Sequence, residues 1–313
     1  MRSQTAQSRI LVVLATVILG TAGASRAETA AAPATAPATA TWRGFTVDAS
    51  IWGAAGDTDF RIDDNGGPVV SKLEYPMRGA MAEVRGSYAL PILHQRLALR
   101  ARYAHSLVVQ GTSKDTDYYP DGSTWNYSES DSEATVQQWD FDLVYLHTFK
   151  KILSIGAFVG YGSEESDFSD TDLVNKIPDY YTIDGDVSSY DVTFSGFRVG
   201  PMARWQIIKR LSVEGELAVM PYVSAKADAD WKLRDYPFHQ EANGIGLNGR
   251  VRVAYTFTQH LGAFIGVRGT WLNANRDGKE SGNDAGATYS DEPIVKDITS
   301  QYFGFEGGVR GMF

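Results

Sequence analysis

Long segments of this chain alternate between apolar and polar positions, and this pattern constrains the fold more than any other feature. From 261 to 271 every odd position holds an apolar residue or glycine, whereas Arg268 and Thr270 lie at even positions. The last segment, 303–313, repeats the pattern, with Glu306 on its second face. Because successive side chains of a strand point to opposite faces, this period predicts β-strands and not helices. The alternation recurs at 139–145, 211–219 and 251–257.

The length of these segments separates two classes of β protein. Strands of soluble domains usually hold about five to six residues, and several segments here run well past that length. Such strands are typical of a transmembrane barrel, in which one face meets lipid and the other a polar interior. A periplasmic sandwich is the alternative that alternation alone permits. The mean hydropathy of -0.24 fits the barrel, because averaging over both faces dilutes the apolar one.

Charged residues on the second face support closure into a barrel. Charges on a lipid face would each cost roughly 2–4 kcal/mol at the bilayer midplane, whereas charges sharing one lumen can pair. Because a ten-stranded barrel is narrow, we expect a filled polar core and not a wide pore. The predicted inward charges are Asp48, Glu83, Asp140, Asp142, Glu214, Glu216, Glu306, Arg85, Arg100, Arg102, Arg198, Arg204, Arg250, Arg252, Arg268 and Arg310.

The breaks between strands come in two sizes that alternate along the chain. Short breaks lie at 91–95, 149–152, 208–210 and 258–260, and long polar ones at 57–71, 113–134, 167–188, 227–243 and 276–296. Four short and five long connections predict an all-β, ten-stranded antiparallel transmembrane β-barrel. Its turns are short on the periplasmic side, its loops are long on the extracellular side, and both termini are periplasmic.

The N-terminus has the composition of an export signal. Two arginines precede an apolar run from Ile10 to Gly20, and small residues lead up to Ala27. This order predicts a cleaved signal peptide, 1–27, because the run is short for a transmembrane helix; an uncleaved anchor is the alternative. An Ala/Pro/Thr linker follows at 28–41, which leaves 42–313 for the barrel. We expect a monomer in the cell outer membrane, surrounded by its lipid.

Composition narrows the function classes. The chain has no cysteine, which excludes disulfides and zinc–thiolate sites. The formal net charge of -9 leaves no basic excess with which to bind nucleic acid. A phosphate-binding glycine loop, a His-x-x-x-His pair and a Gly-x-Ser-x-Gly turn are all missing from the sequence. We therefore predict neither a metal nor a cofactor.

Three stretches resemble the omptin family of ten-stranded outer-membrane endoproteases. They are Ser-Lys-Leu-Glu-Tyr at 71–75, Lys-Asp-Thr-Asp-Tyr-Tyr at 114–119 and Phe-Val-Gly-Tyr at 158–161. The order of elements agrees over nearly all of 42–313, and the terminal Phe313 resembles the sorting signal of bacterial outer-membrane barrels. The resemblance implies an active site at the extracellular end and lipopolysaccharide as an activator and partner. The basic residues that hold lipopolysaccharide in the family have no match, since 162–165 is acidic.

The resemblance also implies catalytic residues. In omptins, two acids on one wall face an Asp–His pair on the other, and a water between them attacks the peptide bond. Asp115 and Asp117 match the acid pair, and Asp230 matches the aspartate of the second pair. The histidine has no match, because Lys232, or Trp231 in an ungapped alignment, stands in its place.

The missing histidine leaves two hypotheses. A general base needs a pKa near the operating pH, which histidine has and lysine lacks. Lys232 is therefore predicted to be a positive partner of an acidic cleft. His239, in the same predicted loop, could replace the histidine beside Asp230 or Asp235, and the simpler alternative is an exposed loop residue. The residues favour a degenerate endopeptidase that has lost its base over an active aspartic-type enzyme that uses Asp115, Asp117, Asp230 and His239.

Acidic residues at the mouth predict the class of ligand. Omptins that cleave next to basic residues seat the cation on acids, and the matching candidates are Asp228 and Asp59, with Phe60 at the second position if one gap is moved. Clustered charge of one sign concentrates ligands of the other sign. We therefore expect cationic peptides or proteins as partners. A small channel is a further alternative that the paired lumenal charges disfavour.

Overall fold

In the computed structural model the described residues are 44–63, 66–92, 96–149, 152–284 and 286–313. The predicted signal peptide and linker, 1–27 and 28–41, lie outside these residues and stay predictions. No helix within the described part of the chain is long and apolar enough to cross a membrane.

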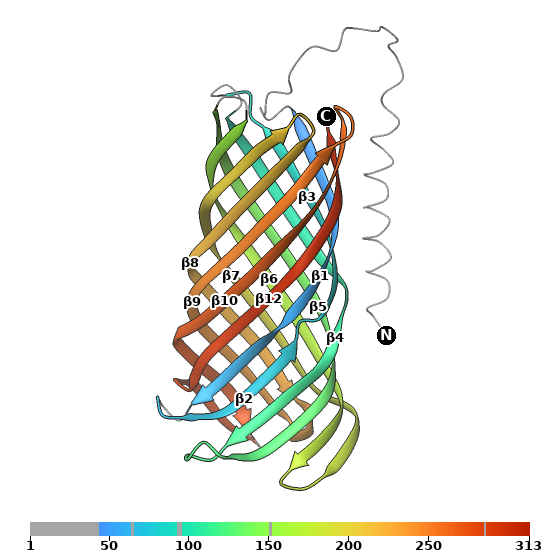
Figure 1. Ribbon diagram of the computed structural model, residues 1–313. Helices are drawn as coiled ribbons and strands as arrows, with labels where there is room; N and C mark the ends of the chain where they lie inside the picture. The colour runs from blue at the N-terminus through green and yellow to red at the C-terminus, as the bar shows by residue number, and fades with distance from the viewer. Residues whose placement is uncertain (1–43, 64–65, 93–95, 150–151, 285) are drawn as a thin grey trace, which may run out of the picture. The chain divides into compact units, whose positions relative to one another are not determined.

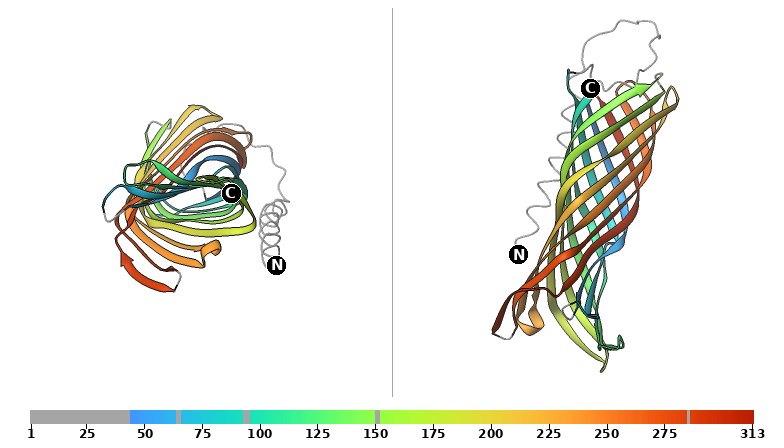
Figure 2. Two further views of the ribbon diagram at one scale, coloured as in Figure 1. Left: turned by 90° about the horizontal axis from the view of Figure 1, so that it is seen from below. Right: turned by 90° about the vertical axis from the view of Figure 1, so that its left-hand side faces the viewer.

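Nearly all described residues lie in β-strands. The elements are β1 (Phe45–Asp63), β2 (Val69–Pro76), β3 (Gly79–Ala89), β4 (Leu97–Tyr118), β5 (Thr124–Phe149), β6 (Leu153–Ile177), β7 (Tyr181–Ile208), β8 (Leu211–Trp231), the 3₁₀ turn η2 (Lys232–Arg234), β9 (Tyr236–Thr256), β10 (Leu261–Asp284), β11 (Ala287–Glu292) and β12 (Val295–Met312). Each strand pairs antiparallel with its neighbours, and the pairing of β1 with β12 closes the sheet into a ring (Figures 1 and 2).

The ring has ten strand positions. β2 and β3 share one position between β1 and β4, while β11 and β12 share one beside β10. The predicted antiparallel barrel is therefore confirmed. The tilted strands run from the end of the barrel that has the short turns to the opposite end, as Figure 1 shows.

The extracellular segments predicted as long loops are mostly strand. Only 119–123 separates β4 from β5 within the predicted loop 113–134, and only 178–180 separates β6 from β7 within 167–188. The sequence assigned these segments to loops because their outer face is polar beyond the lipid, which weakens the apolar alternation that marks a strand. The backbone ladder continues there, since its hydrogen bonds do not depend on side-chain polarity.

The outer face of the barrel is apolar towards the periplasmic end. Large side chains are exposed there on successive strands, among them Ile51, Phe141, Phe197, Ile265 and Phe305. Such a belt is the lipid-facing band of a membrane barrel.

The lumen of the periplasmic half holds the charges that alternation places inside. Each of the seven acids and nine arginines forms at least one ion pair. Glu83 lies among four arginines, with Arg250 at 2.9 Å, Arg102 at 3.3 Å, Arg252 at 3.5 Å and Arg268 in contact. Pairing offsets the desolvation of these buried groups, so the predicted polar core is confirmed in this half.

The lumen of the extracellular half contains a group of stacked aromatic side chains. Phe60 stacks on Tyr190 with ring centroids 4.9 Å apart, and Tyr190 stacks on Tyr75 at 5.1 Å. Phe168 packs against Tyr75 at 4.7 Å and Phe238 against Phe60 at 6.0 Å. These five residues, called the aromatic cluster below, belong to one buried core. The arginine–carboxylate network is therefore limited to the periplasmic half, while the extracellular half buries aromatic side chains beside polar ones such as Asp170 and Gln240.

Candidate functional site

Asp115 and Asp117 lie on β4 and point into the barrel. They share their parity with the buried Ser113, because a register shift in the middle of β4 resets the alternation of that strand. The side-chain amide of Asn126 on β5 donates to Asp117 at 3.1 Å. The structure thus puts the predicted acid pair on one inward face.

Asp115 is held in an unusual environment for a carboxyl group. Its Oδ1 atom is buried and has no hydrogen-bond partner. Burial, with the negative charges of Asp117 and Asp170, raises the pKa of Asp115 to about 8, and Arg234 of η2 partly opposes the rise. At neutral pH this carboxyl is therefore mostly protonated.

Asp170 on β6 is an inward acid that the sequence analysis missed. Its side chain is buried, and it accepts a hydrogen bond from the Ser188 hydroxyl at 2.9 Å. Burial raises the pKa of Asp170, and the hydroxyls of Ser132, Ser188 and Ser113 lessen the rise. The signal was present in the alternation of Phe168 and Asp170, but 167–188 was assigned to a loop.

Asp228, Asp230 and His239 lie on the opposite parity and face away from the lumen. On β8, Ala227 and Ala229 take the inward positions next to the two aspartates. On β9, the buried Gln240 takes the inward position next to His239. His239 donates through Nδ1 to Oδ1 of Asp228 at 2.9 Å. The structure brings His239 to Asp228, and it does not bring His239, Asp230 and Asp115 together on one face.

The inward wall opposite Asp115 is apolar. On β8 the inward positions hold Ala227, Ala229 and Trp231, and Trp231 lines the same pocket as Asp115. Lys232, which stands at the family's histidine position in one alignment, is in the exposed η2 turn with its Nζ 3.5 Å from Asp186.

Asp59 also lies outside the lumen. The neighbouring Phe60 takes the inward position as part of the aromatic cluster. Asp59 pairs with Arg61 at 3.4 Å and lies 4.0 Å from Lys72. Burial raises the pKa of Asp59, while Arg61 and Lys72 oppose the rise. This carboxylate therefore already has cationic neighbours.

Three carboxylates form a row on the outer wall of the extracellular half. Asp167 on β6 is the direct partner of Asp191 on β7, which is the direct partner of Asp228 on β8. Burial, with the charges of Asp167, Glu165 and Asp228, raises the pKa of Asp191 to about 6. Like charges in direct cross-strand positions are destabilising. We call Asp167, Asp191 and Asp228 the acidic row.

His239 extends the acidic row on β9, opposite Asp228. Burial lowers the pKa of His239, but hydrogen bonds to Asp228 and Glu241 outweigh burial, and the pKa is raised overall. The imidazole therefore lies at the β8 end of the row, where it bonds to Asp228.

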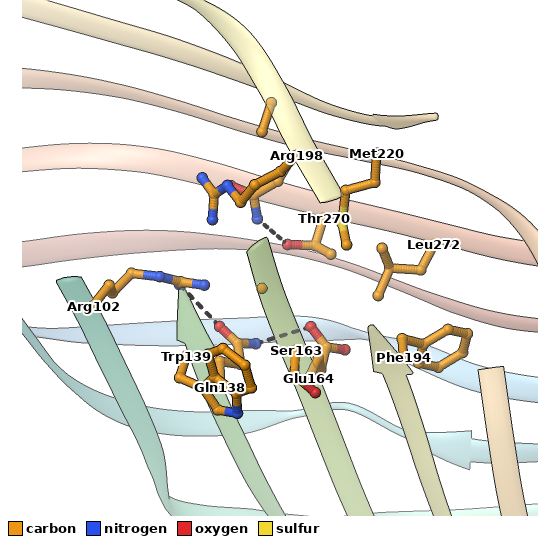
Figure 3. A pocket seen from close by; sticks show the side chains of 13 residues that line it. Arg102, Gln138, Trp139, Ser163, Glu164, Phe194, Arg198, Met220, Thr270 and Leu272 are labelled. Carbon is orange, nitrogen blue, oxygen red and sulfur yellow. Dashed lines mark hydrogen bonds between the residues drawn. The ribbon is translucent and has the colours of Figure 1, made fainter. Parts of the chain in front are cut away.

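A second pocket is lined by Arg102 and Arg198 of the ionic network and by the apolar Phe194 and Met220 (Figure 3). Gln138 links its polar side, since its amide nitrogen donates to Glu164 at 3.1 Å and its oxygen accepts from Arg102 at 3.1 Å. Met220 and Leu272 line the apolar side (Figure 3). Over the described ranges, no group of three or more His, Asp or Glu side chains is arranged to hold a metal ion.

Comparison with solved structures decides the fold. The outer membrane protease OmpT from Escherichia coli superposes with a TM-score of 0.78 and 14% sequence identity, covering 88% of this chain and 100% of that one. The fold is omptin-like. The autotransporter NalP translocator domain from Neisseria meningitidis and OprG from Pseudomonas aeruginosa are more distant, with TM-scores of 0.37 and 0.36, each at 11% identity. They cover 99% and 87% of this chain and 98% and 97% of their own.

No protein-family model and no curated protein sequence matches the chain. The comparison with OmpT therefore establishes an omptin-like outer-membrane barrel as the fold, and the chemistry rests on the residues described above.

Proposed function

We propose that this omptin-like barrel is a non-hydrolytic surface protein that binds cationic polypeptide segments at its acidic row. The observation that carries the proposal is the direction of His239, which faces outward and is bonded to Asp228. Peptide hydrolysis by the family's scheme needs a base across the lumen from Asp115. Trp231 and two alanines occupy that wall.

The other described histidines do not supply the base. His105 and His147 lie on outward parities of β4 and β5, and His260 lies in a turn beside Met312. His94 lies outside the described residues. One observation favours the alternative of an aspartic-type endopeptidase, because Asp115 has a pKa near the operating pH of a general base. The aromatic cluster fills the space beside it, which disfavours a peptide there.

The acidic row supplies the binding chemistry. Its three carboxylates are cross-strand neighbours, so the repulsion among them is relieved when a cation binds. Lysine and arginine side chains of an unfolded segment can reach such an exposed row without entering the barrel. Exposed ion pairs contribute about 0.2–1 kcal/mol each and weaken with salt. Binding is therefore expected to be multivalent and salt-sensitive.

Fluorescence anisotropy of a labelled Lys/Arg-rich peptide tests the proposal on the full chain refolded in detergent. We expect Asp191→Asn to weaken binding by about 1.5- to 5-fold, and Asp191→Asn with Asp228→Asn to weaken it further. Glu292→Gln, which removes an exposed charge on β11, is the matched control and leaves affinity unchanged. Equal affinity in the double variant and the wild type would refute binding at the acidic row.

A further inference from the structure

Asp115 and Asp170 face one small enclosed pocket between β2 and β4–β8. Its lining is rich in oxygen atoms, since four serines stand around the two carboxyl groups. All four serines are buried, and their positions are Ser113, Ser128, Ser130 and Ser188. Trp231 covers the pocket from the β8 side. We call this site the serine pocket.

The carboxyl groups of the serine pocket are incompletely bonded. Asp170 is only 5% exposed, and its Oδ1 atom has no hydrogen-bond partner although Oδ2 accepts from Ser188. Oδ1 of Asp115 is likewise buried without a partner. A buried acceptor without a donor carries a desolvation cost that proteins normally avoid. Two such oxygens in one pocket are available to a donor or to a cation.

The charges around the pocket favour a cation. Asp115 is within electrostatic reach of Asp117 and Asp170, which repel its charge, and of Arg234, which attracts it. Three carboxylates against the guanidinium of Arg234 and the ammonium of Lys114, which also lines the pocket, leave a net negative charge when all are ionised. A bound cation would offset this charge.

The donor atoms select the kind of ion. Carboxylate and hydroxyl oxygens are hard ligands, and the pocket lining offers neither imidazole nor thiolate. Mg²⁺ gives up its water shell reluctantly and needs room for several waters, whereas Ca²⁺ accepts irregular sets of six to eight oxygens. We propose that the serine pocket binds one Ca²⁺ ion through Asp115, Asp170 and the surrounding serine hydroxyls. This site is separate from the acidic row, so it does not rest on peptide binding.

Terbium luminescence tests the proposal. Tb³⁺ accepts the same oxygen ligands as Ca²⁺ and emits when a nearby tryptophan is excited, and Trp231 lines the pocket. The full chain is refolded in detergent without lipopolysaccharide, stripped of cations and titrated with Tb³⁺. We expect saturable emission that Ca²⁺ displaces and that Mg²⁺ displaces only at much higher concentration. Trp231→Phe should reduce the emission, while Ca²⁺ still raises the melting temperature of that variant.

Variants of the pocket decide where the ion binds. Asp170→Asn should weaken Tb³⁺ binding by about tenfold or more, as expected for the loss of a charged partner in a buried site. Ser188→Ala, which removes one hydroxyl, gives a second and milder test, with folding of each variant checked by circular dichroism. Glu292→Gln should bind as the wild type does.

Three results would overturn the proposal. The first is unchanged Tb³⁺ affinity in folded Asp170→Asn and Ser188→Ala. The second is loss of emission in Asp191→Asn alone, which would place the ion on the acidic row. The third is a wild type whose melting temperature does not respond to Ca²⁺, which would leave the two carboxyls as a protonated pair. None of these results bears on peptide affinity, so the function proposed above is judged separately.

Discussion

His239 donates from Nδ1 to Oδ1 of Asp228 over 2.9 Å, and the two residues are direct cross-strand partners on the outer face of β8 and β9. In a strand, a shift of one residue moves a side chain to the other face. His239 therefore points outward from β9, whereas Asp115 and Asp117 point into the lumen. An acid pair and a histidine are both present at the extracellular end, but the wall of the barrel separates them.

Replacing His239 should have little effect on stability. The ring is 41% exposed in its side chain, so its bonds to Asp228 and Glu241 are screened by water. We expect His239→Gln to lower the free energy of unfolding by less than about 1 kcal/mol. Because the pKa of His239 is raised, its contribution is present below pH 6.5 and is lost as the pH rises through the folded-state pKa. Urea unfolding of the wild type and the variant at pH 5.5 and pH 8 measures this loss of unfolding free energy and its pH dependence.

Asp191 should make the barrel less stable as the pH rises. Its pKa is raised from 3.8 to about 6, so the folded state holds this proton more tightly than the unfolded state does. The stability of the wild type should therefore fall between about pH 4 and pH 6 through this group. Asp191→Asn should flatten that part of the profile and raise the urea midpoint at pH 7. An identical pH profile in the variant would contradict this reading of the acidic row.

Glu83 should be among the most sensitive positions of the barrel. It pairs with Arg102, Arg250, Arg252 and Arg268 in the buried ionic half of the lumen. Removing one partner of a buried ion pair leaves uncompensated charge and costs about 3–5 kcal/mol. We expect Glu83→Gln to lose that much unfolding free energy, measured by urea unfolding in detergent. Glu292→Gln on exposed β11 should change it by less than about 0.5 kcal/mol.

Calcium affinity should depend on pH. Asp115 has a pKa of about 8 and must lose its proton before it can bind a cation. Below pH 8, apparent Ca²⁺ affinity should therefore rise by up to about tenfold per pH unit, with release of one proton. Asp115→Asn should remove this dependence and weaken binding. Tb³⁺ titrations at pH 6, 7 and 8 provide the measurement, and equal affinities at all three would contradict the role of Asp115.

The sequence alone predicted the barrel, but it did not predict which side chains face the lumen at the extracellular end. Within the lipid belt, one face must be apolar and the other charged, so the alternation assigns residues such as Glu83 and Arg268 to the lumen. Above the belt the outer face is polar and the inner face mixes polar and aromatic residues, so the parity of Asp170 and His239 can be assigned only after the register is known. The register shift in β4 that turns Asp115 inward has no sequence marker that we recognise.

The resemblance to omptins matched residues by sequence position, which does not show whether a side chain points into the lumen or outward. It named Asp59 and Asp228 as seats for a cation, yet Phe60 and Ala227 hold the inward positions beside them. The aromatic cluster was missed for a similar reason. Its members come from five strands, and only the closed ring brings Phe60 and Tyr75 into contact with Tyr190, which is distant in sequence.

The most direct measurement is cleavage of a dibasic fluorogenic peptide by the full chain refolded with lipopolysaccharide. A non-hydrolytic barrel predicts a rate equal to the protein-free blank in the wild type and in Asp115→Ala alike. Cleavage by the wild type that Asp115→Ala abolishes would contradict the proposed function and identify an active endopeptidase.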